Sequence, residues 1–480
     1  MENEEFFLSI DGRLISGHSF LEVVNPADGR IFARAPDASR SQLDDAVDAA
    51  RRAFRAWAAL PIGDRKSLLN KIGEVILDHV DLLKRLLTRE QGKPHADAEW
   101  EVRGAAAWCQ GSAALELPTV LHENSAERHS VTRRVPIGVV GAIAPWNFPL
   151  ILAVWKVAPA LLAGNTVVLK PSPYTPLTTL RFGELLQRVL PPGVVNVVSG
   201  GDDLGPWMSS HQGIDKISFT GSTVTGKKVM MSAASNLKRL TLELGGNDAA
   251  IVLPDVHVEK IVPELFWAAF RNTGQVCVAT KRLFVHSAIY DAVAKGLVAY
   301  SRRVKIGDGS KPGVQLGPIQ NRRQYCRVLE LIEGAKAAGL RFLTGGTVDE
   351  RSGYFVPVTL IDNPPDKTAV VTEEAFGPVL PLLRFDDIDE VVRRANDSLY
   401  GLAASVWSGN EETARAVGER LRCGTVWINE AQYVSPFATF GGHGQSGLGV
   451  ENGVDGLIEY TNAQTISTRR QVVRADDKSW

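Results

Sequence analysis

The chain has 480 residues, of which 44% are hydrophobic and 22% are charged, a composition typical of a globular protein with a large core. Its 53 basic and 54 acidic residues nearly cancel, so we expect no surface specialised for nucleic acid or an anionic membrane. A chain of this length predicts roughly three domains of ordinary size.

The N-terminal segment and the cysteines indicate in which cellular compartment the protein is expected. The N-terminal MENEEFFLSIDG is acidic and lacks a long apolar stretch, so we expect no signal peptide. The cysteines at 109, 277, 326 and 423 are far apart, with no CxxC pair or histidine cluster beside them. This spacing argues against disulfides and against a metal site, and it favours a reducing cytoplasm.

The first predicted elements are helices. One ends before Pro61, because apolar residues recur at spacings of three and four: Leu43, Val47, Ala50, Phe54 and Trp57. A second helix is predicted over about 65–88 on the same kind of pattern. Both helices are amphipathic, so each is expected to pack one face against a core.

From residue 139 onward, short β-branched runs alternate with helical patterns. Strands are predicted at 139–143, 165–170, 193–198 and 215–220, with a helix at 177–190. The alternation restarts after Gly246 with a strand at 248–253, a helix through 258–273 and a strand at 282–286. This order predicts α/β units with parallel sheets, divided near residue 246. The tail, 456–470, alternates like an edge strand that is either protected or paired with another subunit.

The segment 136–164 is almost wholly apolar but contains Asn147 between aromatic and proline neighbours. Its length raises the possibility of a membrane span, but its prolines, Asn147 and Lys156 argue against one. We therefore predict a buried strand, a turn and a buried helix. A buried amide is costly without partners, so Asn147 is either satisfied structurally or functional.

A glycine-rich turn is one candidate binding site. FTGSTVTG (219–226) closes a predicted strand and precedes a helix, so Gly221 and Ser222 could accommodate a phosphate at the helix N-terminus. The usual GxGxxG dinucleotide pattern is missing. An ordinary strand-to-helix turn would give the same local sequence.

Two further segments contain potentially reactive side chains. Cys277, in RNTGQVCVATKR, lies on a predicted turn, where it is either an accessible nucleophile or an inert buried thiol. Glu243, in LTLELGGN, either points to solvent from an alternating strand or faces a cleft. The Gly-Gly pair after Glu243 indicates a close backbone approach and favours the cleft.

Several motifs occur together in a fixed order. PWNFP, FTGST, LELGG and GQVC follow one another, accompanied by EQGKP (90–94), PPGVVNVVSG (191–200), EEAFGPVL (373–380) and FGGHGQSGLG (440–449). In this order they resemble, nearly end to end, the NAD(P)-dependent aldehyde dehydrogenase superfamily, in its non-acylating, hydrolytic branch. The resemblance implies oxidation of an aldehyde to a carboxylic acid.

The resemblance also implies catalytic roles. Cys277 would add to the aldehyde as a thiolate and form a hemithioacetal, then a thioester. Asn147 would stabilise the oxyanion together with the backbone N–H of Cys277. Glu243 would act as general base for the water that hydrolyses the thioester. One alternative is a CoA-acylating aldehyde dehydrogenase, but such relatives usually lack this carboxylate, so Glu243 argues against it. A second alternative is a non-catalytic binding protein on the same fold, and the presence of all three residues argues against that.

Cofactor residues are implied in the same way, with no metal. The predicted contacts to NAD are Trp146, Lys170, Ser172, Gly205, Phe219, Gly221, Ser222, Leu244, Glu374 and Phe376. Pro173 stands where many NAD-preferring relatives have a glutamate that repels a 2′-phosphate, so NADP remains an alternative. Other departures from the family pattern are Asn247, Thr439, Gly444 and Val450.

The implied substrate tunnel is mostly apolar. It comprises Phe148, Trp155, Val276, Val278, Gln432, Val434 and Phe440, so the expected substrate is a neutral aliphatic or aromatic aldehyde. The resemblance implies a Rossmann-like cofactor domain (1–116 and 137–245), a catalytic α/β domain (246–445) and a small β oligomerisation flap (117–136 and 456–480). A homodimer or homotetramer is expected, without a nucleic-acid or membrane partner.

Overall fold

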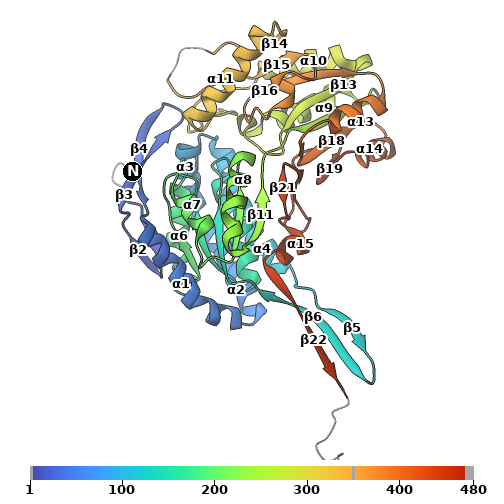
Figure 1. Ribbon diagram of the computed structural model, residues 1–480. Coiled ribbons are helices and arrows are strands. Elements are labelled where there is room, and N and C mark those ends of the chain that lie inside the picture. The colour runs from blue at the N-terminus through green and yellow to red at the C-terminus, as the bar shows by residue number, and fades with distance from the viewer. Residues whose placement is uncertain (1–3, 349–351, 471–480) are drawn as a thin grey trace, which may run out of the picture.

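Parallel strands and their crossover helices build both halves of the protein, as seen in a computed structural model that describes residues 4–348 and 352–470. Figure 1 shows the two halves as separate α/β lobes, with a three-stranded arm leaving one of them. The change of lobe falls between β11 (Arg239–Glu243) and β12 (Asp248–Val252), which belong to different sheets. The predicted α/β fold class is confirmed.

The first lobe contains an eight-stranded sheet of order β2-β1-β9-β8-β7-β10-β11-β21. The five strands from β9 to β11 are parallel, whereas β1 and β21 pair antiparallel at either side. The predicted strands appear as β7 (Val139–Ile143), β8 (Thr166–Lys170), β9 (Val195–Val197) and β10 (Lys216–Thr220); the others are β1 (Leu8–Ile10), β2 (Arg13–Ile15) and β21 (Gly447–Leu448).

Eight helices of this lobe have the bounds α1 (Arg40–Ala59), α2 (Ile62–Asp78), α3 (Val80–Gln91), α4 (His95–Ala114), α5 (Pro149–Leu162), α6 (Leu177–Leu186), α7 (Leu204–Ser210) and α8 (Thr223–Ala233). The single helix predicted at 65–88 is wrong, because α2 ends and α3 begins at His79. The His79 ring Nδ1 lies 2.8 Å from the carbonyl oxygen of Val75, and the His79 N–H donates to Ile76 instead. A side chain that competes for a backbone carbonyl thus breaks the helix.

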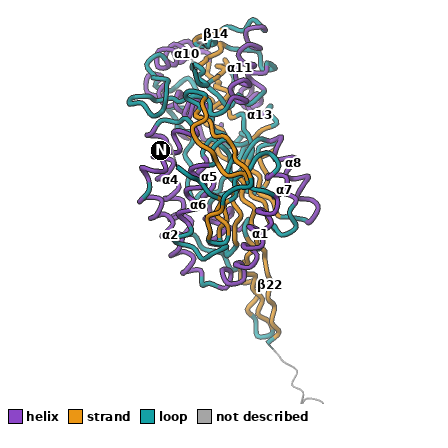
Figure 2. Tube along the Cα trace, turned by 90° about the vertical axis from the view of Figure 1, so that its left-hand side faces the viewer, coloured by secondary structure: helices purple, strands orange, loops and turns teal. Residues whose placement is uncertain are grey.

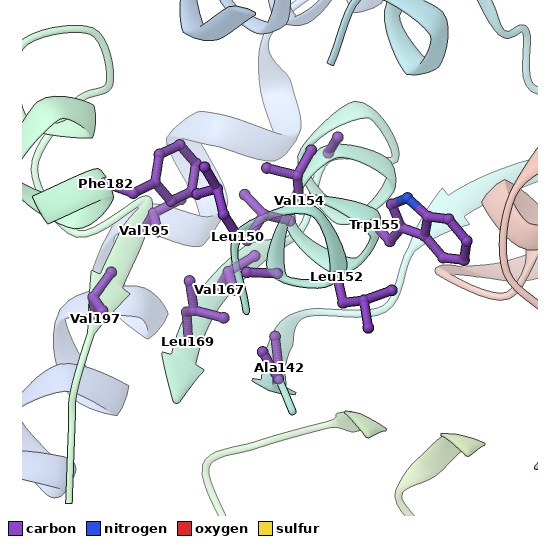
Figure 3. Close-up of a cluster of buried hydrophobic side chains, with 14 of the residues drawn as sticks. Ala142, Leu150, Leu152, Val154, Trp155, Val167, Leu169, Phe182, Val195 and Val197 are labelled. Carbon is purple, nitrogen blue, oxygen red and sulfur yellow. The ribbon is translucent and has the colours of Figure 1, made fainter. Parts of the chain in front are cut away.

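The apolar segment 136–164 forms β7 and α5 at the centre of the first lobe. Every residue of α5 is buried, and Figure 3 shows side chains of α5 over those of the neighbouring strands and Phe182. Burying each large aliphatic side chain stabilises the fold by about 1.5–3 kcal/mol. No helix within the described ranges is long and apolar enough to cross a membrane.

The second lobe contains a seven-stranded sheet of order β14-β15-β16-β13-β12-β18-β19. Its remaining strands are β13 (Thr280–His286), β14 (Phe342–Thr344), β15 (Thr359–Asp362), β16 (Val379–Phe385), β18 (Ala403–Trp407) and β19 (Thr425–Ile428). Its helices are α9 (Val258–Phe270), α10 (Ser287–Ser301), α11 (Arg322–Ala337), α12 (Ala369–Thr372), α13 (Ile388–Asn396) and α14 (Glu411–Gly418). Two-stranded pairs β3 (Ser19–Asn25) with β4 (Arg30–Asp37) and β17 (Tyr400–Gly401) with β20 (His443–Gly444) complete the sheets.

The projecting arm is a three-stranded antiparallel sheet of order β22-β6-β5, visible from the side in Figure 2. It consists of β5 (Val120–Asn124), β6 (Arg128–Pro136) and β22 (Thr461–Arg469). The predicted tail strand therefore begins only at Thr461, because α15 (Gly453–Ile458) precedes it. Residues 471–480 of the predicted flap lie outside the described residues, and the domain limits remain predictions.

Candidate active site

Four predicted site segments follow neighbouring parallel strands of the first lobe. Asn147 comes after β7, Lys170 ends β8, Gly221 follows β10 and Glu243 ends β11. Because these strands are parallel and paired in register, their carboxyl ends share one edge of the sheet. Ligands of open α/β sheets bind in the crevice at this edge.

Asn147 is 4% exposed and is held on both its backbone and its side chain. Its carbonyl oxygen accepts from Lys93 Nζ at 2.9 Å and from Asn272 Nδ2 at 3.2 Å. Its own Nδ2 donates to the carbonyl of Gln275 at 3.1 Å. An amide nitrogen carries two hydrogens, so one can fix the side chain while the other remains available to a ligand.

Cys277 reaches the same edge from the second lobe, on the turn between the 3₁₀ segment Arg271–Gly274 and β13. Asn272 and Thr273 adopt left-handed backbone conformations there, and the Lys281 ammonium donates to the carbonyls of Val276 and Cys277 at 2.9 and 2.8 Å. Burial raises the pKa of the Cys277 thiol to about 12, and the charge of Lys281 opposes this shift. The thiol is therefore protonated at neutral pH until a base removes its proton.

Glu243 is 4% exposed, so the solvent-facing alternative is wrong. Neither of its carboxylate oxygens has a hydrogen-bond partner among the described residues. Burial raises its pKa well above the ordinary value, Glu451 adds to this effect, and Lys156 opposes it. Glu243 is also one of the charges that act on the Cys277 thiol. An unpartnered buried carboxyl group whose charge reaches a thiol is a candidate to accept a proton.

Two charged residues that act on Glu243 were missed by sequence reasoning. Lys156 Nζ lies 2.6 Å from Glu451 Oε1, with both side chains buried. Lys156 did stand out as a charge inside an apolar run. Nothing in the local sequence around Glu451, however, indicated that Glu451 would pair with Lys156. Lys281, which also carries no predicted role, approaches Glu374 to 3.5 Å.

Three of the predicted cofactor residues lie at or just after the carboxyl ends of β8 and β10. Lys170 is 5% exposed and burial lowers its pKa to about 8; within the described chain its Nζ donates to a single protein acceptor, Pro171 O at 3.3 Å. Ser222 caps α8 by accepting from Thr225 N. Gly221 admits no side chain, because a Cβ there would lie 2.5 Å from the Phe219 ring.

The remaining predicted cofactor residues come from both lobes. Glu374 accepts from Gly246 N at 3.1 Å, and the Phe376 ring meets the Trp146 ring edge-on, with 5.2 Å between centroids. Ser172 follows β8, Gly205 lies in α7, and Leu244 directly follows β11. Spare donors on Lys170, a capped helix N-terminus and the small residue Gly221 after β10 fit a dinucleotide.

The apolar residues of the predicted tunnel belong to one hydrophobic cluster that also contacts Cys277: Phe148, Trp155, Val276, Val278, Val434 and Phe440. The Trp155 ring meets the Phe440 ring edge-on at 5.7 Å between centroids. Gln432, the polar exception, donates to Ala268 O at 2.6 Å. The structure thus places the predicted apolar residues in or against the same hydrophobic cluster that Cys277 packs against. Among the residues that it describes, no histidine, cysteine and carboxylate group could hold a metal ion.

Comparison with known proteins gives one consistent family. The model of the aldehyde dehydrogenase family matches residues 15–466. A Pseudomonas protein named "Probable aldehyde dehydrogenase" is 44% identical, over 97% of this chain and 95% of its own. Among solved structures, the NAD⁺ complex of an aldehyde dehydrogenase from Bacillus cereus superposes with a TM-score of 0.95 at 38% identity, covering 98% of each chain. An NADP-dependent enzyme of E. coli has a TM-score of 0.94 at 36% identity, covering 98% of this chain and 100% of its own.

The chain belongs to the aldehyde dehydrogenase family. It is an oxidoreductase that acts on aldehydes with NAD or NADP as cofactor, so the reaction class and cofactor type predicted from the sequence are confirmed.

Proposed function

We propose that this dehydrogenase oxidises neutral aliphatic or aromatic aldehydes to carboxylic acids through a thioester on Cys277. The observation that carries the proposal is the buried, unpartnered carboxyl group of Glu243, which acts electrostatically on the Cys277 thiol. A nucleophile and a base held together in a crevice are what acyl transfer to water requires.

In the first half-reaction, Cys277 loses its proton and its sulfur attacks the aldehyde carbon. Since the Cys277 thiol has a pKa of about 12, proton removal needs a neighbouring base, and Glu243 has a suitably raised pKa. The amide of Asn147 and the backbone N–H of Cys277 donate to the carbonyl oxygen as it becomes negative.

In the second half-reaction, Glu243, which has first released the Cys277 proton to solvent, removes a proton from a water molecule that attacks the thioester. The carbon–sulfur bond then breaks, releasing a carboxylic acid and regenerating Cys277. When bound, the nicotinamide supplies the acceptor for the hydride that leaves the thiol adduct. Lys170, Ser172, Ser222 and Trp146 would hold the dinucleotide at its adenosine and pyrophosphate parts. Glu374 and Phe376 would hold the nicotinamide part, with Gly205, Phe219, Gly221 and Leu244 near the site.

We favour NAD over NADP. Asp202 and Asp37 are the charges that act on Lys170, and a 2′-phosphate near Lys170 would be repelled by their carboxylates. The test is kcat/KM for the two cofactors, and a higher value with NADP would contradict the preference.

The substrate class is tested by NADH formation with hexanal, benzaldehyde and succinic semialdehyde, without CoA. An apolar tunnel predicts turnover of the first two and weak turnover of the charged third, because nothing among the predicted lining residues would neutralise a carboxylate. A preference for succinic semialdehyde would contradict the proposed substrate class. Turnover only with CoA would identify an acylating enzyme, and no turnover with any of these would favour a binding protein.

We further propose that the arm joins identical subunits into a dimer or tetramer. Val120 and Leu121 on β5 and Ile466 on β22 are 47%, 56% and 44% exposed, which is typical of surfaces that become covered on association. Sedimentation of the full chain and of a Leu121→Asp, Ile466→Asp variant tests this, and an unchanged mass would contradict it. Four free cysteines support a reducing, cytoplasmic location, which cell fractionation would test.

A further inference from the structure

The motif EQGKP places a lysine in the interior of the first lobe. Lys93 is 1% exposed and follows Gly92, whose left-handed backbone (φ 96°) ends α3. A Cβ at Gly92 would meet Pro318 at 2.8 Å and Pro26 at 2.9 Å. The turn that carries Lys93 is therefore confined on both sides, and the lysine enters the interior from a fixed position.

The Lys93 ammonium has three defined neighbours. Its Nζ donates to Glu101 Oε2 at 2.5 Å and to the carbonyl oxygen of Asn147 at 2.9 Å. It also lies 3.8 Å from the centroid of the Phe148 ring. A buried charge is tolerated only when it is paired and hydrogen-bonded, and here two of its three partners are consecutive residues of the Asn147 turn.

Glu101 fastens the same turn from its other side. Its Oε1 accepts from Leu150 N at 2.9 Å and from Ile151 N at 3.3 Å. These N–H groups belong to the first turn of α5, whose N-cap residue, Phe148, provides no side-chain cap. Glu101 thus accepts hydrogen bonds from N–H groups at the start of α5 that have no partner within the helix. Lys93 in turn neutralises the charge of Glu101.

The Asn147 carbonyl also connects this turn to the one that carries the nucleophile. Asn272 Nδ2 donates to Asn147 O at 3.2 Å, and Asn147 Nδ2 donates to Gln275 O at 3.1 Å. Gln275 is itself held, since its Oε1 accepts from Gln320 N at 2.8 Å. Loss of the Lys93 contact would leave the Asn147 carbonyl with Asn272 as its donor among the described residues, and so loosen the peptide whose side chain is to meet the reacting oxygen.

We propose that Lys93 is a positioning residue that aims the Asn147 amide at the aldehyde oxygen, with Glu101 as its counter-ion. The proposal rests on the oxyanion role proposed above for Asn147. Preorganised donors stabilise a developing oxyanion only when their geometry is fixed. Lys93 touches neither the predicted nucleophile nor the base, so its effect on the rate passes through Asn147.

A double-mutant cycle separates this role from simple stabilisation of the fold. Lys93→Met is made alone and together with Asn147→Ala; a second form, Lys93→Met with Glu101→Gln, avoids leaving an unpaired carboxylate. Rates are divided by the concentration of NAD-binding sites, so incomplete folding does not affect the comparison. Arg65→Met is the matched control, because Arg65 is a buried cation that donates to the carbonyls of Leu60 and Leu162, away from Asn147.

With Asn147 present, Lys93→Met is expected to lower kcat/KM about 10²-fold, the effect of a small misplacement of a reacting group. In the Asn147→Ala background the same change should have less than about a twofold effect, because the donor it aims is missing. Arg65→Met should leave the site-normalised kcat/KM unchanged. Equal losses in both backgrounds would overturn the positioning role, whereas full activity of Asn147→Ala alone would refute the role of Asn147 itself.

Discussion

The Nζ of Lys156 lies 2.6 Å from Oε1 of Glu451, and both side chains are buried where their opposite charges act on the carboxyl group of Glu243. The negative charge raises the Glu243 pKa and the positive charge lowers it. Burial makes the largest contribution to the raised pKa of the proposed base, and two residues remote from it in the sequence adjust that pKa further.

Glu451→Gln is expected to lower the Glu243 pKa, because it removes the negative neighbour and leaves the positive one. Glu243 must be ionised to accept a proton, so the acidic limb of the kcat profile should move to lower pH. Glu459→Gln is the control, since Glu459 is not among the charges that act on Glu243. A movement to higher pH, or none, would contradict the assignment.

Glu243→Gln is expected to slow both half-reactions. The amide keeps the shape of the side chain but cannot accept the proton of the thiol or of the water, so steady-state kcat should fall about 10²–10⁴-fold. Because the thiol loses its proposed base, rapid mixing should reveal no burst of NADH, whereas a burst of about one equivalent per site would show that another base ionises Cys277. Cys277→Ala should lack both the burst and turnover, and turnover by that variant would refute the nucleophile.

The reactivity of Cys277 in the free enzyme should rise steeply with pH. Its thiol has a pKa of about 12, so the thiolate fraction grows about tenfold for each pH unit below that value. Alkylation by iodoacetamide, corrected with Cys277→Ala for the other cysteines, measures this dependence. A rate that levels off near neutral pH would mean that the thiol is already ionised.

Aldehyde chain length should control the specificity constant. Each methylene group that enters the apolar cluster around Cys277 contributes about 0.8 kcal/mol, or about a fourfold rise in kcat/KM. The series from propanal to hexanal tests this directly. A flat series would mean that the alkyl chain stays in water.

Asp248 should make the protein less stable as the pH rises. It is 5% exposed, its Oδ2 has no partner within the described chain, and burial raises its pKa from 3.8 to about 7. The folded state therefore binds a proton more tightly than the unfolded state, and this stabilisation declines as pH rises from about 4 to about 7. Asp248→Asn stays neutral, so its Tm relative to the parent should increase over that interval; a constant difference would contradict the shift.

The buried parallel strands could be predicted from the sequence. Strands such as Val139–Ile143 and Lys216–Thr220 were found because continuous burial leaves a run of apolar residues. The positions of Cys277, Glu243 and Asn147 followed from the order of motifs. The break at His79 was not predicted, since it depends on one side chain that competes for a carbonyl.

Long-range ionic contacts also escaped prediction. Lys156 and Glu451 are 295 positions apart. Local sequence periodicity cannot indicate a contact between two residues that meet only in the folded chain. Lys93 and Glu101 are near in sequence, but their significance lies in their contacts to Asn147 and the start of α5. Such contacts arise from tertiary packing, which pattern and propensity do not report.

The antiparallel pairing of β21 with β11, in which Gly447 lies opposite Glu243, has a consequence for biosynthesis. The chain is made from its N-terminus, so β11 must wait for more than two hundred further residues before its last neighbour emerges from the ribosome. Until then Lys156 also lacks its Glu451 counter-ion. A prematurely terminated chain could contain the thiol and the base and still lack the strand and the charge that set their environment, so activity would be confined to polypeptides translated nearly to completion.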